Sequence, residues 1–117
     1  MATFSKQILS GSTNGTGITV VATATVGTTI HATGISATTL DEIWLYATNT
    51  SAATVKLTLE WGEATAPNGN IEINIGAEGT GLVLVAPGIL LQNSLVVKAF
   101  AGTTNVVTLT GYVNRIS

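Results

Sequence analysis

The chain has 117 residues, of which only 9% are charged, against about 25% in an ordinary soluble domain. Its four basic and six acidic residues give a formal net charge of −2, and it contains no cysteine. This composition excludes disulfide scaffolds, cysteine-based zinc sites and thiol catalysis. It also excludes the dense basic patch that binding to nucleic acid or to an anionic membrane surface requires.

The small number of charged residues indicates how the surface of the protein interacts with its surroundings. Hydrophobic residues make up 45% of the chain, so the core is of ordinary size, and one domain is expected at this length. Thr, Ser, Asn and Gly take the surface places that Lys and Glu usually hold. A weakly charged surface keeps a protein in solution poorly. The composition therefore favours a protein whose surface is largely covered by neighbours.

No targeting or membrane segment is expected. Residues 1–10 lack a basic start followed by an apolar run, so no signal peptide is predicted. The longest apolar stretch, residues 81–91, is interrupted by Pro87 and is too short to span a bilayer. We therefore expect a protein that is made in the cytoplasm.

The N-terminal segment, residues 1–16, is predicted to be a flexible arm in front of one β-sandwich domain over residues 17–117. Its second half reads SGSTNGTG up to Gly17 and is flexible by composition. An apolar arm on such a tether can add to the sheet edge of a neighbour. The alternative is that the arm is the first strand of its own sheet. The arm residues predicted to contact another chain are Phe4, Ile8 and Leu9.

The rest of the chain favours β-strands, because Thr, Val and Ile are abundant and fit a pleated sheet. No segment has a sustained helical apolar period, whereas alternation with a period of two recurs. The expected strands are residues 17–25, 28–32, 42–48, 54–61, 70–75, 82–86, 95–100 and 106–114. About eight short antiparallel strands separated by turn residues predict an all-β fold, a jelly-roll-like β-sandwich.

Two of these strands have one polar face. Residues 54–61 and 70–75 place apolar side chains on one side and charged or amide side chains on the other. The side chains expected to point into the core are Val55, Leu57, Leu59, Trp61, Ile71, Ile73 and Ile75. The charged residues of this region, expected on the solvent side, are Lys56, Glu60, Glu63 and Glu72.

Three other strands, residues 42–48, 82–86 and 95–100, are apolar on both faces. In the first of them Ile43, Leu45 and Ala47 alternate with Trp44 and Tyr46. Each sheet of a two-layer sandwich has only one core face, so a second apolar face needs another subunit. We predict that the residues of this strand that contact a subunit or a capsid are Trp44 and Tyr46, with core packing as the alternative.

The residues that suggest catalysis form no catalytic motif. His31 is the single histidine, and no spacing links it to Asp41 or to a serine, so we expect a strand histidine at a sheet edge or interface. Glu60 and Glu63 flank Trp61 as in some glycosidase sites. The alternation, however, places Glu60 on the solvent face and Glu63 in a loop. We predict no enzyme and no catalytic, metal or cofactor site.

Several strand segments resemble a group of small virion proteins of tailed bacteriophages and prophages. They are residues 40–49 (LDEIWLYATN), 56–62 (KLTLEWG), 81–90 (GLVLVAPGIL), 93–101 (NSLVVKAFA) and 111–117 (GYVNRIS). The resemblance runs from about Gly17 to the end of the chain. It is a likeness of strand sequences and carries no catalytic signature.

The resemblance implies a head decoration (cement) protein, a β-sandwich that sits on the capsid surface of the virion and stabilises it. The partners it implies are the major capsid protein and further copies of the chain, as a dimer or trimer, with no nucleic acid and no membrane. The alternative is a tail- or fibre-associated module that binds host-surface carbohydrate. In that case Trp44, Tyr46 or Trp61 would stack on sugar rings.

Overall fold

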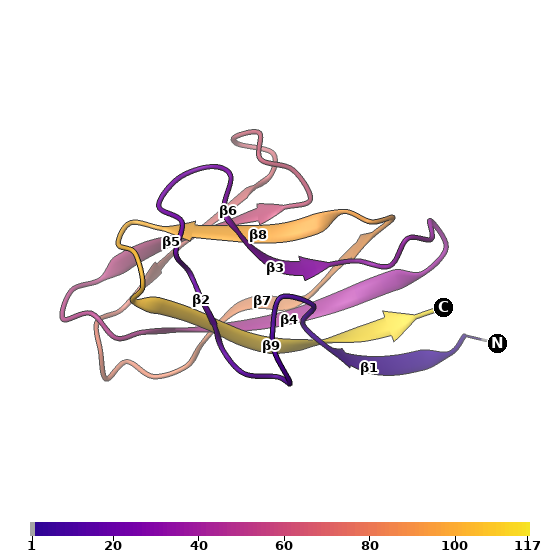
Figure 1. Cartoon of the computed structure of the whole chain (residues 1–117), viewed down its shortest axis with the longest axis horizontal. Helices are drawn as coiled ribbons and strands as arrows, with labels where there is room; N and C mark the ends of the chain where they lie inside the picture. The colour runs from indigo at the N-terminus through magenta and orange to yellow at the C-terminus, as the bar shows by residue number, and fades with distance from the viewer. Residues whose placement is uncertain (1) are drawn as a thin grey trace.

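Nine β-strands in two antiparallel sheets make up the computed structural model, which describes residues 2–117 (Figure 1). The strands are β1 (Phe4–Ile8), β2 (Ile18–Thr19), β3 (Thr28–Ala32), β4 (Leu40–Asn49), β5 (Val55–Trp61), β6 (Asn70–Ile75), β7 (Val83–Gln92), β8 (Val96–Ala101) and β9 (Val107–Ile116). Within residues 2–117 no helix is present, as the abundance of β-branched residues predicts.

The order of the strands is that of a jelly roll. The sheet that we call sheet A has the order β1-β9-β4-β7, with β2 also paired to β9, and sheet B has the order β3-β8-β5-β6. From β2 onward every connection crosses between the sheets except the β5–β6 hairpin. Figure 1 shows the two layers, with sheet B drawn above sheet A. The predicted jelly-roll-like β-sandwich is confirmed, and β1 is the strand in addition to the expected eight.

The N-terminal segment lies along the edge of its own sheet. Strand β1 pairs with the C-terminal half of β9, from Phe4 opposite Ile116 to Ile8 opposite Tyr112. The short strand β2 pairs with the other half of β9. The N-terminal segment is therefore the first strand of its own sheet, which was the second of the two alternatives. Residues 10–17 form the loop that connects β1 to β2 along the same edge of sheet A.

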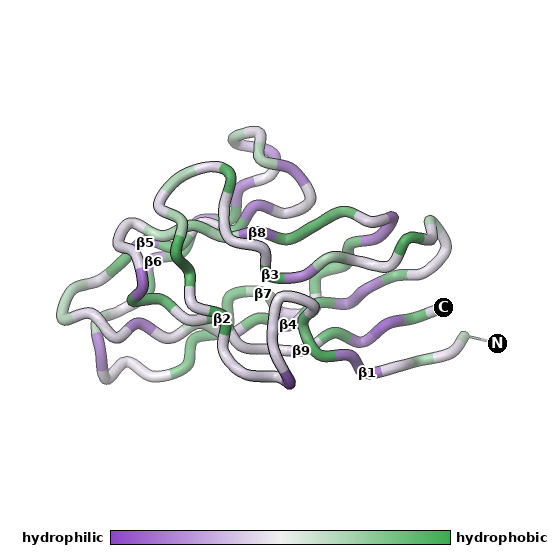
Figure 2. The backbone as a smooth tube through the Cα atoms, in the orientation of Figure 1, coloured by the Kyte–Doolittle hydropathy of each residue, from purple (hydrophilic) through white to green (hydrophobic). Residues whose placement is uncertain are grey.

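The core lies between the two sheets, and Figure 2 shows hydrophobic segments in both layers of the sandwich. The buried apolar side chains are Leu9, Ile18, Val20, Ile30, Ile43, Leu45, Ala47, Val55, Leu57, Leu59, Ile75, Val85, Ala86, Val97, Ala99, Ala101, Val107, Leu109 and Val113. Trp61, Ile71 and Ile73 are partly buried and pack against this cluster. The predicted inward faces of β5 and β6 are therefore confirmed.

The segment after β2 departs from the prediction. A strand over residues 17–25 was expected, but pairing ends at Thr19 and the chain crosses from sheet A to sheet B. This crossing covers Glu60, which accepts hydrogen bonds from Thr25 Oγ1 at 2.8 Å and from the Gly27 N–H at 2.6 Å. Glu60 is consequently 2% exposed, so its predicted place among solvated charges is wrong.

Candidate functional site

The outer face of sheet A is the candidate functional site, because it is apolar yet faces away from the core. Along β4 buried and half-buried residues alternate without a break from Leu40 to Asn49. Ile43, Leu45 and Ala47 point into the core, and the residues between them point outward. The second apolar face predicted for this strand is thus an outer face of the sandwich.

The strand register arranges the outward side chains in rows across the sheet. The row through Trp44 is Ile8, Tyr112, Trp44 and Pro87. On one side lies the row of Thr110, Tyr46 and Leu84, and on the other the polar row of Lys6, Asn114, Glu42 and Leu90, followed by the row of Phe4, Ile116, Leu40 and Gln92. Side chains opposite one another on neighbouring strands are in contact range. The rows therefore form one surface that is mainly apolar and is crossed by the polar row through Glu42.

Two aromatic rings lie at the centre of this surface. The rings of Trp44 and Tyr112 are stacked, with centroids 6.1 Å apart and an interplanar angle of 12°. A bulge in the β4–β7 pairing places Gly88 beside the indole at a φ of 75°. A Cβ at Gly88 would lie 2.8 Å from Trp44 Cζ2. The glycine therefore leaves the space that the indole occupies.

The polar groups of the face have partners within it. Glu42 Oε1 accepts a hydrogen bond from Trp44 Nε1 at 2.7 Å and another from Asn114 Nδ2 at 3.0 Å. The bond from Asn114, followed by that from Trp44, holds the pKa of Glu42 below its usual value of 4.5. The Nζ of Lys6 lies 4.9 Å from the centroid of the Tyr112 ring, a cation–π contact.

The apolar flanks of the face are open to solvent. On β1, Phe4 is 72% exposed and Ile8 is 52% exposed, and on β7, Leu84 and Leu90 are 46% and 48% exposed. Exposed large apolar side chains that gather on one face of a folded protein indicate an interaction surface. The predicted contact residues Phe4, Ile8, Trp44 and Tyr46 are therefore brought together on one face.

The fifth predicted contact residue, Leu9, does not lie on the outer face of sheet A. Its side chain is 1% exposed and belongs to the core between the sheets. Strand alternation explains this difference, because a residue next to the outward Ile8 must turn inward. The prediction that Leu9 contacts another chain is therefore wrong for the chain in this conformation.

Sequence reasoning missed Tyr112, Leu84 and Leu90, which complete the face. The signal for Tyr112 was present, since β9 alternates buried and half-buried residues and Val113 is fully buried. That alternation places Tyr112 on the outer side, but it does not reveal that β9 lies beside β4. The pairing of these two strands comes from the jelly-roll topology.

The outer face of sheet B is different in character. Lys56 and Glu72 form an exposed ion pair at 3.0 Å across β5 and β6, and Lys98 lies on β8. The third strand predicted to be apolar on both faces is β8, so its outward residues Val96 and Phe100 lie on this more polar side. The three strands with two apolar faces therefore do not gather on one side of the molecule.

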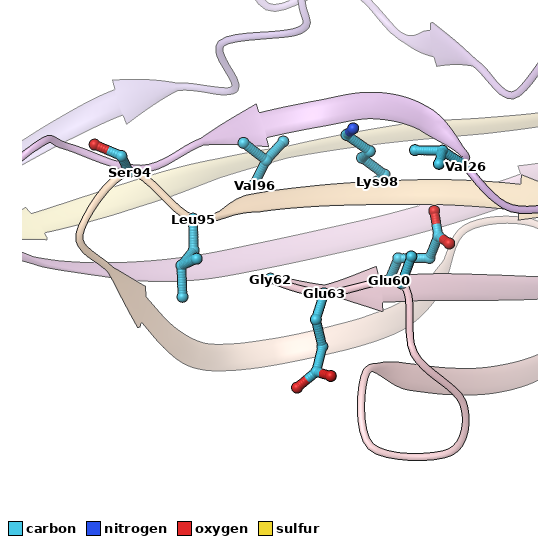
Figure 3. A pocket seen from close by; sticks show the side chains of 9 residues that line it. Val26, Glu60, Gly62, Glu63, Ser94, Leu95, Val96 and Lys98 are labelled. Carbon is cyan, nitrogen blue, oxygen red and sulfur yellow. The ribbon is translucent and has the colours of Figure 1, made fainter.

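A shallow pocket of about 310 Å³ opens on the side of sheet B (Figure 3). It is lined by Val26, Glu60, Gly62, Glu63, Ala64, Ser94, Leu95, Val96 and Lys98. Neither Trp44 nor Trp61 belongs to this lining. Trp61 packs against the core and its Nε1 donates to the carbonyl of Leu90 at 3.3 Å. The pocket thus lacks the aromatic platform that a sugar ring would stack on.

A cluster of His31, Asp41 and Arg115 that the sequence did not reveal contains a buried carboxylate and joins the two sheets. Asp41, which is 0% exposed, accepts from Arg115 Nε at 2.7 Å and from Arg115 Nη2 at 2.9 Å. His31 Nε2 lies 2.8 Å from Asp41 Oδ2. The edge strand β3 of sheet B carries His31, while Asp41 and Arg115 belong to sheet A. His31 is on an edge strand as predicted, but its side chain is buried and paired.

Both ring nitrogens of His31 are engaged. The backbone N–H of Ser10 donates to Nδ1 at 3.0 Å, so the ring proton lies on Nε2 and is donated to Asp41. The Ser10 hydroxyl accepts from the N–H of Ala32 at 2.7 Å. A nucleophilic serine would need a free ring nitrogen on the histidine. These contacts therefore hold the sheets together and do not form a Ser-His-Asp triad.

The charge of Asp41 predicts an acid-sensitive part of the stability. Burial alone would raise the pKa of Asp41, but Arg115 and His31 outweigh burial and hold this pKa below its usual value of 3.8. A depressed native pKa contributes stability above the unfolded pKa, and this contribution is lost as the pH falls through the native pKa. We expect the free energy of unfolding of the wild type to exceed that of Asp41→Asn most at neutral pH. The difference should shrink below about pH 4.

Urea titrations of both proteins between pH 7 and pH 2 measure this difference. A gap that stays constant to pH 2 would contradict the assignment of the effect to the Asp41 carboxylate.

No group of three or more His, Asp or Glu side chains within residues 2–117 is placed to hold a metal ion. None of the described residues forms a helix long and apolar enough to cross a membrane. Comparison of the chain with models of protein families, with curated proteins and with solved structures finds no match.

Proposed function

We propose that this chain is a structural protein of a virion, a head decoration protein that binds the major capsid protein and stabilises the capsid as an oligomer. Two lines of reasoning support the proposal. The strand segments quoted above resemble small virion proteins of tailed bacteriophages, and only 9% of the residues are charged. The jelly-roll fold is also common among capsid proteins, although a fold alone does not establish a function.

The observation that carries the proposal is the outer face of sheet A. It exposes Phe4, Ile8, Leu84 and Leu90 while its one carboxylate, Glu42, is already hydrogen-bonded within the face. Covering such a surface removes apolar area from water and leaves no buried charge without a partner. The geometry thus suits a protein that functions by being covered in an assembly.

The mechanism we propose is mechanical. Many copies bind at equivalent positions of the capsid lattice and bridge neighbouring capsid subunits. Contacts that are weak individually then add up, because each additional contact forms at a high effective concentration. A surface with few charges lowers the desolvation cost of these contacts.

The test is binding to capsids of the phage that encodes this chain. We expect the purified protein to sediment with capsids that lack it, in a saturable ratio to the capsid subunits. The decorated capsids should also withstand a higher temperature before they release DNA. An unrelated β-sandwich of similar size serves as the control and should stay in the supernatant. Failure to sediment, together with binding to host-surface carbohydrate, would favour the tail or fibre alternative and overturn the proposal.

A further inference from the structure

The outer face of sheet A exposes apolar side chains, and its composition indicates what kind of partner binds it. We infer that this face binds the same face of a second copy, so that the protein is a two-fold symmetric dimer with two sheets A stacked on each other. The inference rests on the proposed function in that it names the partner taken by this face in the assembled state. The capsid would then be contacted through other parts of the surface.

The size of the face is sufficient for such a dimer. Four strands spaced about 4.8 Å apart and about eight residues of β4 at about 3.4 Å each give a face of about 19 by 27 Å. Stacking two of these faces buries about 1,000 Å² in total, which reaches the lower limit for a specific interface. The dimer is therefore expected to form reversibly.

The charges of the face favour a second copy over a charged partner. Lys6 and Glu42 are its charged residues on β1 and β4, so the face as a whole is neutral and two copies do not repel each other. Glu42 accepts two hydrogen bonds from its own chain and can be covered without losing a partner. Lys6 lies on the edge strand β1, and its ammonium group, which contacts the Tyr112 ring in the single chain, can turn outward to the wet rim when the face is covered.

The geometry of stacking selects a dimer rather than a trimer. A surface that packs on itself makes an isologous contact, which is closed after two copies. Two aligned sheets pack about 10 Å apart with their strands within about 30° of each other, as in the sandwich itself.

A matched pair of leucines provides the test. Leu84 on the face and Leu95 beside sheet B are both 46% exposed, so Leu84→Glu and Leu95→Glu add the same charge at equal exposure. We expect the wild type and Leu95→Glu to approach the mass of a dimer in light scattering as the concentration rises. Leu84→Glu should weaken self-association by roughly tenfold or more, because its carboxylate would be buried without a partner.

Cross-linking tests the same face without disturbing its apolar residues. The chain contains no cysteine, so single cysteines can be introduced cleanly. Thr110 lies on the face in the row of Tyr46, and the exposed Thr29 lies on β3 of sheet B. With a flexible bis-maleimide, Thr110→Cys should give a covalent dimer and Thr29→Cys should not.

Three results would overturn the inference: a wild type that is monomeric at every concentration, a trimer, or a dimer that Leu84→Glu leaves intact. None of these results affects the capsid sedimentation, which is measured separately and decides the proposed function. A dimer that behaves as expected but does not bind capsids would support the inference and count against the proposed function.

Discussion

Replacing Asp41 by asparagine is expected to lower the free energy of unfolding by about 3 kcal/mol. Three donors point at the carboxylate of Asp41, namely His31 Nε2–H and the Nε–H and Nη2–H groups of Arg115. Asparagine offers one carbonyl oxygen and an NH₂ group, so at least one donor meets another donor. The guanidinium of Arg115 also loses its buried counter-ion.

The expected size of this loss follows from burial. Removing one partner of a buried ion pair costs about 3–5 kcal/mol, whereas exposed pairs contribute about 1 kcal/mol or less. Asp41 is 0% exposed, but the side chain of Arg115 is 31% exposed and can turn partly toward water. The loss should therefore lie at the lower end of the range for buried pairs.

Urea unfolding at pH 7, followed by the fluorescence of Trp44 and Trp61, measures the effect. The control is Lys56→Ala, because the side chains of Lys56 and its partner Glu72 are 53% and 52% exposed. Both variants must be compared with the wild type at one protein concentration, since association adds to apparent stability. A loss for Asp41→Asn as small as that for Lys56→Ala would contradict the role assigned to the buried pair.

Features set by neighbours in the sequence could be predicted well. The inward faces of β5 and β6 follow from an alternation that is complete within each strand, so Leu57, Leu59 and Ile73 could be assigned without knowing the fold. The second apolar face of β4 could be recognised in the same way. Alternation is a local property of an extended chain, and it holds whichever strand lies alongside.

Features that depend on which segments meet in space could not be predicted. Glu60 reads as a solvent-facing acid, but the crossing from β2 to β3 covers it. His31 and Asp41 are ten residues apart on strands of different sheets, and no spacing rule brings them together. Strand β8 has two apolar faces like β4, yet it belongs to the other sheet. Each of these outcomes is decided by the topology.

Because of this alternation, the inward side chains of β4 form part of the core and the outward ones form the proposed contact surface. The variant Leu45→Ala tests the inward face. Leu45 is 0% exposed in the central part of sheet A, between β9 and β7. Truncation removes buried apolar surface and leaves a cavity, so we expect a loss of about 2–5 kcal/mol in the free energy of unfolding. The volume-conserving Leu45→Met should lose less than about 1.5 kcal/mol.

The urea midpoint and slope distinguish this effect from a change in the unfolded state, because only the midpoint should move. The neighbouring Tyr46 faces outward, so Tyr46→Ala should leave most of the stability of the monomer in place and act on self-association instead. If Leu45→Ala unfolded at the wild-type midpoint, the inner face of β4 would not be the core of the sandwich. The assignment of inward residues of β4 to the core and of outward residues to a contact surface would then also be wrong.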